Sequence, residues 1–166
     1  MPLSDVVGPV RRVVTEESAE GRSRVWLDGE PTNVKTPTDE IRSVLIWATQ
    51  GSPAAFTGDD DPGEWVLGTA PPAGGSRVVH FTLAPGEKRT APHRNDTLDY
   101  IVAVSGETTI YLDDNTVVLQ PGDVFVQRGT NHAIGNHGAV PAVTVTVLLD
   151  GTPKREGSLS STDQAR

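Results

Sequence analysis

The chain has 166 residues, a length that suits one domain, and its 14 basic against 22 acidic side chains give a net charge of −8. This negative charge repels phosphate backbones, so we expect no nucleic-acid partner. The chain has no cysteine, which excludes disulfides, thiolate metal ligands and a cysteine nucleophile.

Hydrophobic residues make up 36% of the chain and aromatic residues only 5%, so we expect a core built mostly from Val, Leu and Ile. Seventeen glycines and thirteen prolines favour many turns and few long helices. The first residues lack the basic stretch and apolar run of a secretory signal, and every apolar run is too short to span a membrane. We therefore expect a cytoplasmic protein without a membrane partner.

The N-terminal part of the chain predicts a tail, three strands and one long loop. Residues 1–10 form the expected tail, and short strands are predicted over 11–15 and 23–28. The more apolar stretch 42–49 predicts a strand buried on both faces, and we expect all three strands to extend the sheets of one barrel. Residues 51–75 contain four Pro and six Gly and predict a loop, either a lid or a solvated excursion.

From residue 76 onward the strand signals come close together. Asp113-Asp114-Asn115 is typical of a hairpin turn. Many short strands joined by Gly and Pro turns predict an all-β sandwich or barrel, here with strands over 76–83, 97–105, 108–112, 116–119, 124–126, 131–135 and 142–149. We expect a single barrel domain over 11–150, with its core motifs in 76–149, followed by a polar tail over 151–166.

Two imidazoles and one carboxylate stand in two short segments, each built as loop, strand and turn. His93 and Asp99 lie in the segment 86–106, and His132 lies in the segment 122–136. Two histidines and one carboxylate can bind one divalent metal and leave open positions for water, O2 or a substrate oxygen. Because side chains alternate along a strand, Asp99 and His132 can both point into one barrel.

The two segments resemble the two signature motifs of the cupin family of small β-barrels. The residues that carry the resemblance are Gly86, His93, Asn95, Asp99 and Gly106 in the first motif, and Gly122, Gln127, Gly129, His132 and Asn136 in the second. The family has a second histidine where this chain has Asn95, a glutamate at Asp99 and a proline at Gln127. The resemblance implies a double-stranded β-helix, or jelly roll, with extra N-terminal strands.

The resemblance also implies a metal site inside the barrel. His93, Asp99 and His132 would hold a divalent transition metal such as Fe, Zn, Mn or Ni, and the same three residues would be catalytic. Asp99 reaches about 1.5 Å less far than a glutamate, and Asn95 offers an amide oxygen, a poorer ligand than imidazole. The site can therefore also lack a metal, and a histidine with Asp99 would then act as an acid–base pair.

Four further side chains are candidates for binding a substrate: Asn95, Gln127, Trp47 and His80. Gln127 stands where the rim of the family's barrel approaches the ligand. Trp47 lies in the most apolar predicted strand, a position more typical of a core residue. His80 either lines the cavity or points to solvent. In the long loop, Trp65 either closes over the barrel or anchors the loop to it.

These observations predict a metal-dependent enzyme that acts on a small molecule, of the dioxygenase, isomerase, lyase or cyclase type. The alternative is a metal-free barrel that binds or senses a small apolar metabolite, or dehydrates it by acid–base chemistry. A third reading is a structural, storage-like barrel. Small members of the family often pair through their N-terminal strands, and unpaired strand edges over 11–28 favour a homodimer.

Overall fold

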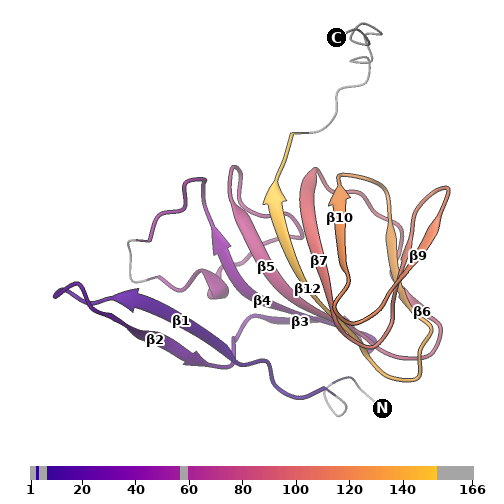
Figure 1. Cartoon of the computed structure of the whole chain (residues 1–166), viewed down its shortest axis with the longest axis horizontal. Coiled ribbons are helices and arrows are strands. Elements are labelled where there is room, and N and C mark those ends of the chain that lie inside the picture. The colour runs from indigo at the N-terminus through magenta and orange to yellow at the C-terminus, as the bar shows by residue number, and fades with distance from the viewer. Residues whose placement is uncertain (1–2, 4–6, 57–59, 153–166) are drawn as a thin grey trace, which may run out of the picture.

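The protein, seen here as a computed structural model, folds almost entirely into β-strands (Figure 1). The structure describes residues 3, 7–56 and 60–152, so the predicted terminal tails lie largely outside the described residues. The elements are β1 (Arg12–Glu17), β2 (Ser23–Gly29), β3 (Val34–Thr38), β4 (Ile41–Thr49), the 3-10 helix η2 (Pro62–Glu64), β5 (Ser76–Leu83), β6 (Lys88–Arg89), β7 (Thr97–Ser105), β8 (Thr108–Tyr111), β9 (Thr116–Leu119), β10 (Val124–Arg128), β11 (Ala133–Asn136) and β12 (Ala142–Asp150). The all-β prediction is confirmed. Within the described residues, no helix is long and apolar enough to cross a membrane.

Two antiparallel sheets make the barrel. The larger sheet has six strands in the order β10-β7-β12-β5-β4-β3, and the smaller has four in the order β6-β11-β8-β9. In Figure 1 the smaller sheet stands beside the β7 and β10 side of the larger one. The non-consecutive strand order arises because β12 returns to lie between β5 and β7. This return brings residues from distant parts of the chain onto one inner face.

The core between the sheets is small and aliphatic. Ala103, Ile110 and Leu119 are buried, and Phe125 and Ile134 pack against them. Burial along β7 alternates, which matches the predicted pattern of one inward and one outward face. Each fully buried aliphatic side chain contributes roughly 1.5–3 kcal/mol, so this cluster stabilises the wall that carries Asp99.

The first two strands form a sheet of their own, which corrects the prediction that they extend the barrel. β1 and β2 pair with each other, and among the described residues no further strand pairs with them. Because a lone hairpin is marginally stable, it needs other contacts. Arg12 supplies them by donating to Asp61 at 2.5 and 2.8 Å and to the Ile46 carbonyl at 3.1 Å. Trp26 also meets Trp47 edge to face, with ring centroids 6.1 Å apart. The homodimer stays a prediction.

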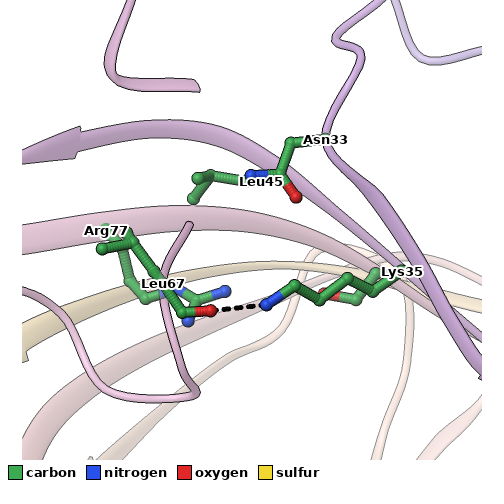
Figure 2. A pocket seen from close by; sticks show the side chains of 6 residues that line it. Asn33, Lys35, Leu45, Leu67 and Arg77 are labelled. Carbon is green, nitrogen blue, oxygen red and sulfur yellow. Dashed lines mark hydrogen bonds between the residues drawn. The ribbon is translucent and has the colours of Figure 1, made fainter. Parts of the chain in front are cut away.

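The long loop over 51–75 is tied to the larger sheet along its second half. Side chains of the sheet region donate hydrogen bonds to its backbone carbonyls: Asn33 to Trp65 at 2.8 Å, Lys35 to Leu67 at 2.5 Å, and Arg77 to Gly68 and to Thr69, the latter at 2.9 Å. Figure 2 shows the side chains that line the recess beneath this part of the loop. This half of the loop is therefore an anchored cover rather than a solvated excursion. Residues 57–59 lie outside the described part.

Two glycines in turns provide a matched test of how tightly the barrel end is packed. Gly106 has φ +67°, and a Cβ there would lie 2.3 Å from the Pro141 carbonyl oxygen. Gly122 has φ +99°, and nothing lies within 4 Å of a Cβ placed there. Both Gly→Ala changes carry the cost of the left-handed conformation, about 1–2 kcal/mol, but only Gly106→Ala must also displace backbone.

We predict that Gly106→Ala lowers the free energy of unfolding by about 3 kcal/mol, and Gly122→Ala by no more than about half as much. Urea unfolding followed by Trp fluorescence measures both losses. Equal losses in the two variants would contradict the close approach at Gly106.

Candidate functional site

The loop before β7 and the start of β11 bring two histidines into contact. His93 and His132 exchange two backbone hydrogen bonds, of 2.9 and 3.0 Å, and their ring centroids lie 4.3 Å apart. The His93 side chain is exposed, whereas His132 is only 4% exposed. His93 Nδ1 lies 3.0 Å from the Ala91 carbonyl oxygen, which can only accept. That contact places a proton on Nδ1 and leaves Nε2 of neutral His93 with a free lone pair.

Gln127 contacts the side chain of the second histidine, His132. Its side chain is 1% exposed, and its Nε2 lies 2.7 Å from His132 Nδ1. The same Nδ1 lies 3.2 Å from the Thr130 carbonyl oxygen. With the amide nitrogen toward the ring, Gln127 donates to Nδ1. With the amide turned over, Nδ1–H donates to Gln127 and Thr130, and Nε2 is bare. Gln127 therefore controls which nitrogen of His132 carries the proton.

Asp99 completes the cluster from β7. It is 3% exposed and lies directly opposite Gln127 in the β7–β10 pairing. Its Oδ1 is buried and has no hydrogen-bond partner within the described part of the chain. Burial raises the pKa of the Asp99 carboxyl, and the Thr97 side chain and then the positive charge of His93 oppose that effect. Of the three residues that the sequence singled out, His93 and His132 are in contact, and Asp99 is connected to them through Gln127, its partner in the strand pairing.

The environment of His132 favours its neutral form. Burial lowers the pKa of the His132 imidazole, and the nearby charge of protonated His93 lowers it further. Hydrogen bonds from the imidazole to the backbone of Thr130 and His93 act in the opposite direction. A neutral imidazole beside an exposed one can accept a proton from a bound molecule.

The types of side chain present suit a bound metal ion, but their placement does not. Two imidazoles and one carboxylate are a suitable set for iron or zinc. Across residues 7–56 and 60–152, however, no group of three or more His, Asp or Glu side chains is placed so that it could hold an ion. Asp99 has the shorter of the two carboxylate side chains, and its partner in the strand pairing is Gln127. The trio therefore does not fit a three-ligand site as the side chains stand.

Two of the predicted substrate-binding residues lie on the wrong face of the sheet. Trp47 pairs with Val78, and that row of paired residues continues to Tyr100, the neighbour of Asp99. His80 pairs with Val145 in the next row on the same outer face. Because side chains alternate, both residues point away from the face that carries Asp99. Trp47 packs on Trp26, and burial lowers the pKa of His80.

The remaining candidates are placed differently from one another. Gln127 contacts His132, so its amide serves the histidine rather than an open surface. Asn95 is half-buried in the loop before β7, and its role in substrate binding stays a prediction. Trp65 follows η2, and its backbone carbonyl accepts from Asn33, which agrees with the anchoring alternative.

Sequence reasoning missed Arg77 on the inner face of β5. Its row of paired residues runs through Leu148 to Asp99, so Arg77 and Asp99 share one face two strands apart. Arg77 is 6% exposed, burial lowers the pKa of its guanidinium, and its Nε is buried without a partner in the described residues. The sequence signal that could have identified Arg77 is its position two residues before the apolar Val79, on the same face of the strand. It lines the recess of Figure 2, which does not include the trio.

Comparisons with known proteins agree with the fold and add relatives. A family model described as a cupin domain matches residues 79–148. The chain is 31% identical over 150 residues to the cupin-domain-containing oxidoreductase fogC of Aspergillus ruber, covering 85% of this chain and 72% of the relative. It is 34% identical over 130 residues to the phomopsin biosynthesis cluster protein C' of Diaporthe leptostromiformis, covering 73% and 67%.

Two further matches extend this picture. The cupin-domain-containing oxidoreductase virC of Hypocrea virens is 31% identical over 150 residues, covering 86% of this chain and 76% of the relative. Among solved structures, KdgF from Halomonas sp. is similar with a TM-score of 0.50 at 17% identity, covering 75% of this chain and 88% of that one. At this identity the structural match supports the fold alone.

The burial of Asp99 generates a prediction about stability and pH. Its pKa is raised in the folded state, so the folded chain binds more protons than the unfolded chain above the ordinary pKa of 3.8. Stability is therefore lost as the pH rises through that window. We predict that Asp99→Asn raises the free energy of unfolding at pH 7 and that the gain vanishes below pH 3.8.

Asp28→Asn is the matched control, because the hydrogen bond from Arg11 lowers the pKa of the exposed Asp28. This variant should show no gain at pH 7. Urea unfolding between pH 3 and pH 8 measures both variants. A loss of stability in Asp99→Asn at pH 7 would show that the carboxylate is favourably paired.

Proposed function

The chain belongs to the cupin family, and we propose that it is an enzyme that transforms a small organic molecule where His93 and His132 meet. The observation that carries the proposal is the cluster itself: an exposed imidazole tilted against a buried one, with the buried Asp99 opposite Gln127, which contacts the buried ring. Two relatives named cupin-domain oxidoreductases, matched over most of both chains, support an enzyme rather than a storage barrel.

The proposed chemistry is a proton transfer. His132 is kept neutral by burial, and its Nε2 accepts a proton from a hydroxyl or an acidic C–H group of the substrate. With the Gln127 amide turned over, its oxygen and the Thr130 carbonyl accept from the opposite nitrogen and hold the ring in the required tautomer. His93 is the imidazole on the exposed side, so it contacts the incoming molecule first.

Asp99 is the second ionisable group of the cluster whose pKa is shifted. Burial raises its pKa, so its carboxyl gives up its proton less readily than an exposed one. Pairs of groups whose environments shift their pKa values are typical of acid–base sites. In this proposal His132 serves as the base and forms an acid–base pair with Asp99.

A divalent metal is the second candidate, and two specific contacts favour it. His93 donates from Nδ1 to the Ala91 carbonyl, and His132 Nδ1 lies beside the Thr130 carbonyl. Histidines that bind metals commonly donate their other ring nitrogen in this way. A bound Fe, Zn, Mn or Ni ion would supply a Lewis acid or an O2 site, and His93 and His132 are the residues that would hold it.

Turnover tests the role of His132. We predict that a compound transformed by the native chain in a mass-spectrometric screen of small hydroxylated metabolites is turned over at least about 10²-fold more slowly by His132→Gln. Because the loss is chemical, the affinity for the compound should change by less than about tenfold.

His80→Gln is the control, since it makes the same change in a half-buried histidine on the outer face. Its kcat should match that of the native chain. Full turnover in His132→Gln, or an equal loss in His80→Gln, would rule out the proposed base.

Elemental analysis separates the two candidates. The metal candidate predicts about one first-row ion per chain in protein purified without chelator or histidine tag. It also predicts loss of the ion in His93→Gln and in His132→Gln, but retention in His80→Gln. Active protein with less than about a tenth of an ion per chain would leave the metal-free proton transfer as the mechanism.

A further inference from the structure

Three side chains on the smaller sheet form a continuous series of hydrogen bonds away from the histidine pair. His137 follows β11, and its Nδ1 donates to Glu87 Oε2 at 2.6 Å. Tyr111 ends β8, and its hydroxyl donates to His137 Nε2. The order carboxylate, imidazole, hydroxyl is the arrangement that activates nucleophilic oxygens in enzymes, because the base is oriented by a third group.

The series lies on the outer face of the sheet. Ile110 and Ile134 face each other across β8 and β11 and belong to the core. Tyr111 follows Ile110 in the strand, so it points to the opposite face. The pairing of Tyr111 with Ala133 places its ring on the face that also holds Gly135.

Gly135 makes the approach of Tyr111 to His137 possible. A Cβ at this position would lie 2.8 Å from Tyr111 Cε2 and 3.3 Å from the Tyr111 hydroxyl. Any larger residue would therefore have to displace the Tyr111 ring from its present position. The absence of a side chain at Gly135 therefore lets the Tyr111 hydroxyl contact the His137 imidazole.

Two further features support a chemical role. The Arg89 guanidinium carbon lies 4.0 Å from the centroid of the Tyr111 ring, where its charge attracts negative charge on the phenol oxygen. Glu87 adopts φ +61°, a left-handed conformation that costs a non-glycine residue about 1–2 kcal/mol. Strained backbone of this kind is often retained at functional sites.

We propose that Tyr111 is a nucleophilic site that takes an acyl group from activated carboxylic esters. The Tyr111 oxygen attacks the ester carbonyl carbon while its proton passes to His137 Nε2. Collapse of the adduct breaks the bond to the leaving oxygen, which takes the proton from His137. The products are an acyl-Tyr111 ester and an alcohol, and Glu87 stabilises the protonated imidazole between the two steps.

The chain carries its own reference for this reaction. It contains two tyrosines, Tyr111 and Tyr100. Tyr100 is 38% exposed on the outer face of the larger sheet, and no imidazole is hydrogen-bonded to its hydroxyl in the parts of the chain described. Exposure alone would therefore let a small ester reach Tyr100, so a faster reaction at Tyr111 reports activation rather than access.

The test uses p-nitrophenyl acetate and the full chain at pH 7.5, with acetylation at each tyrosine measured by peptide mass spectrometry. Tyr111 should be acetylated at least about tenfold faster than Tyr100, a modest part of the roughly 10²–10⁴ that a positioned base contributes in enzymes. His137→Gln should reduce the Tyr111 rate to that of Tyr100, and Glu87→Gln should reduce it in part. The Tyr100 rate should be unchanged in both variants.

Equal rates at the two tyrosines of the native chain would overturn the proposal. So would a Tyr111 rate that His137→Gln leaves unchanged. An unaltered Tyr100 rate and an unaltered melting temperature in each variant establish that the fold is intact. If a variant melts lower, the Glu87→Gln rate measured well below its transition supplies the same comparison.

Discussion

The two backbone hydrogen bonds between His93 and His132 are the contact on which the candidate site depends. His93 lies in a loop between β6 and β7, with an exposed side chain, so little else fixes its position. The ring of His132, by contrast, is fixed by its contact with the buried Gln127 side chain. These two bonds therefore fix the position of the exposed His93 relative to the buried His132.

Much of the fold follows from local sequence signals. The turn residues over 113–115 predicted the hairpin, and β8 pairs with β9 around them. The regular alternation of β7 predicted its buried face. β3 was missed because Val34–Thr38 is exposed throughout and contains Pro37, which is unusual in a strand. The separate β1–β2 sheet could not be foreseen, because it depends on the distant ion pair of Arg12 with Asp61.

For the site, the same logic succeeded on one strand and failed on another. Alternation in β7 allowed Asp99 to point into the barrel, and its side chain is buried. β4 is apolar on both faces, so periodicity could not tell which way Trp47 points, and a register shift between Leu45 and Trp47 changes the count. The bond between Gln127 and His132 joins residues five apart across a turn. No pattern in the sequence distinguishes that contact from an exposed glutamine at a barrel rim.

The hairpin of β1 and β2 is secured at its base and projects away from the barrel at its tip (Figure 1). Arg12 holds the base to both Ile46 and Asp61, whereas the tip turns at Gly21 with local hydrogen bonds between Ser18 and Arg22. Foreign peptide inserted at the tip would therefore leave the anchoring contacts and the histidine pair undisturbed. This arm is a natural attachment point for an epitope or a fluorescent label.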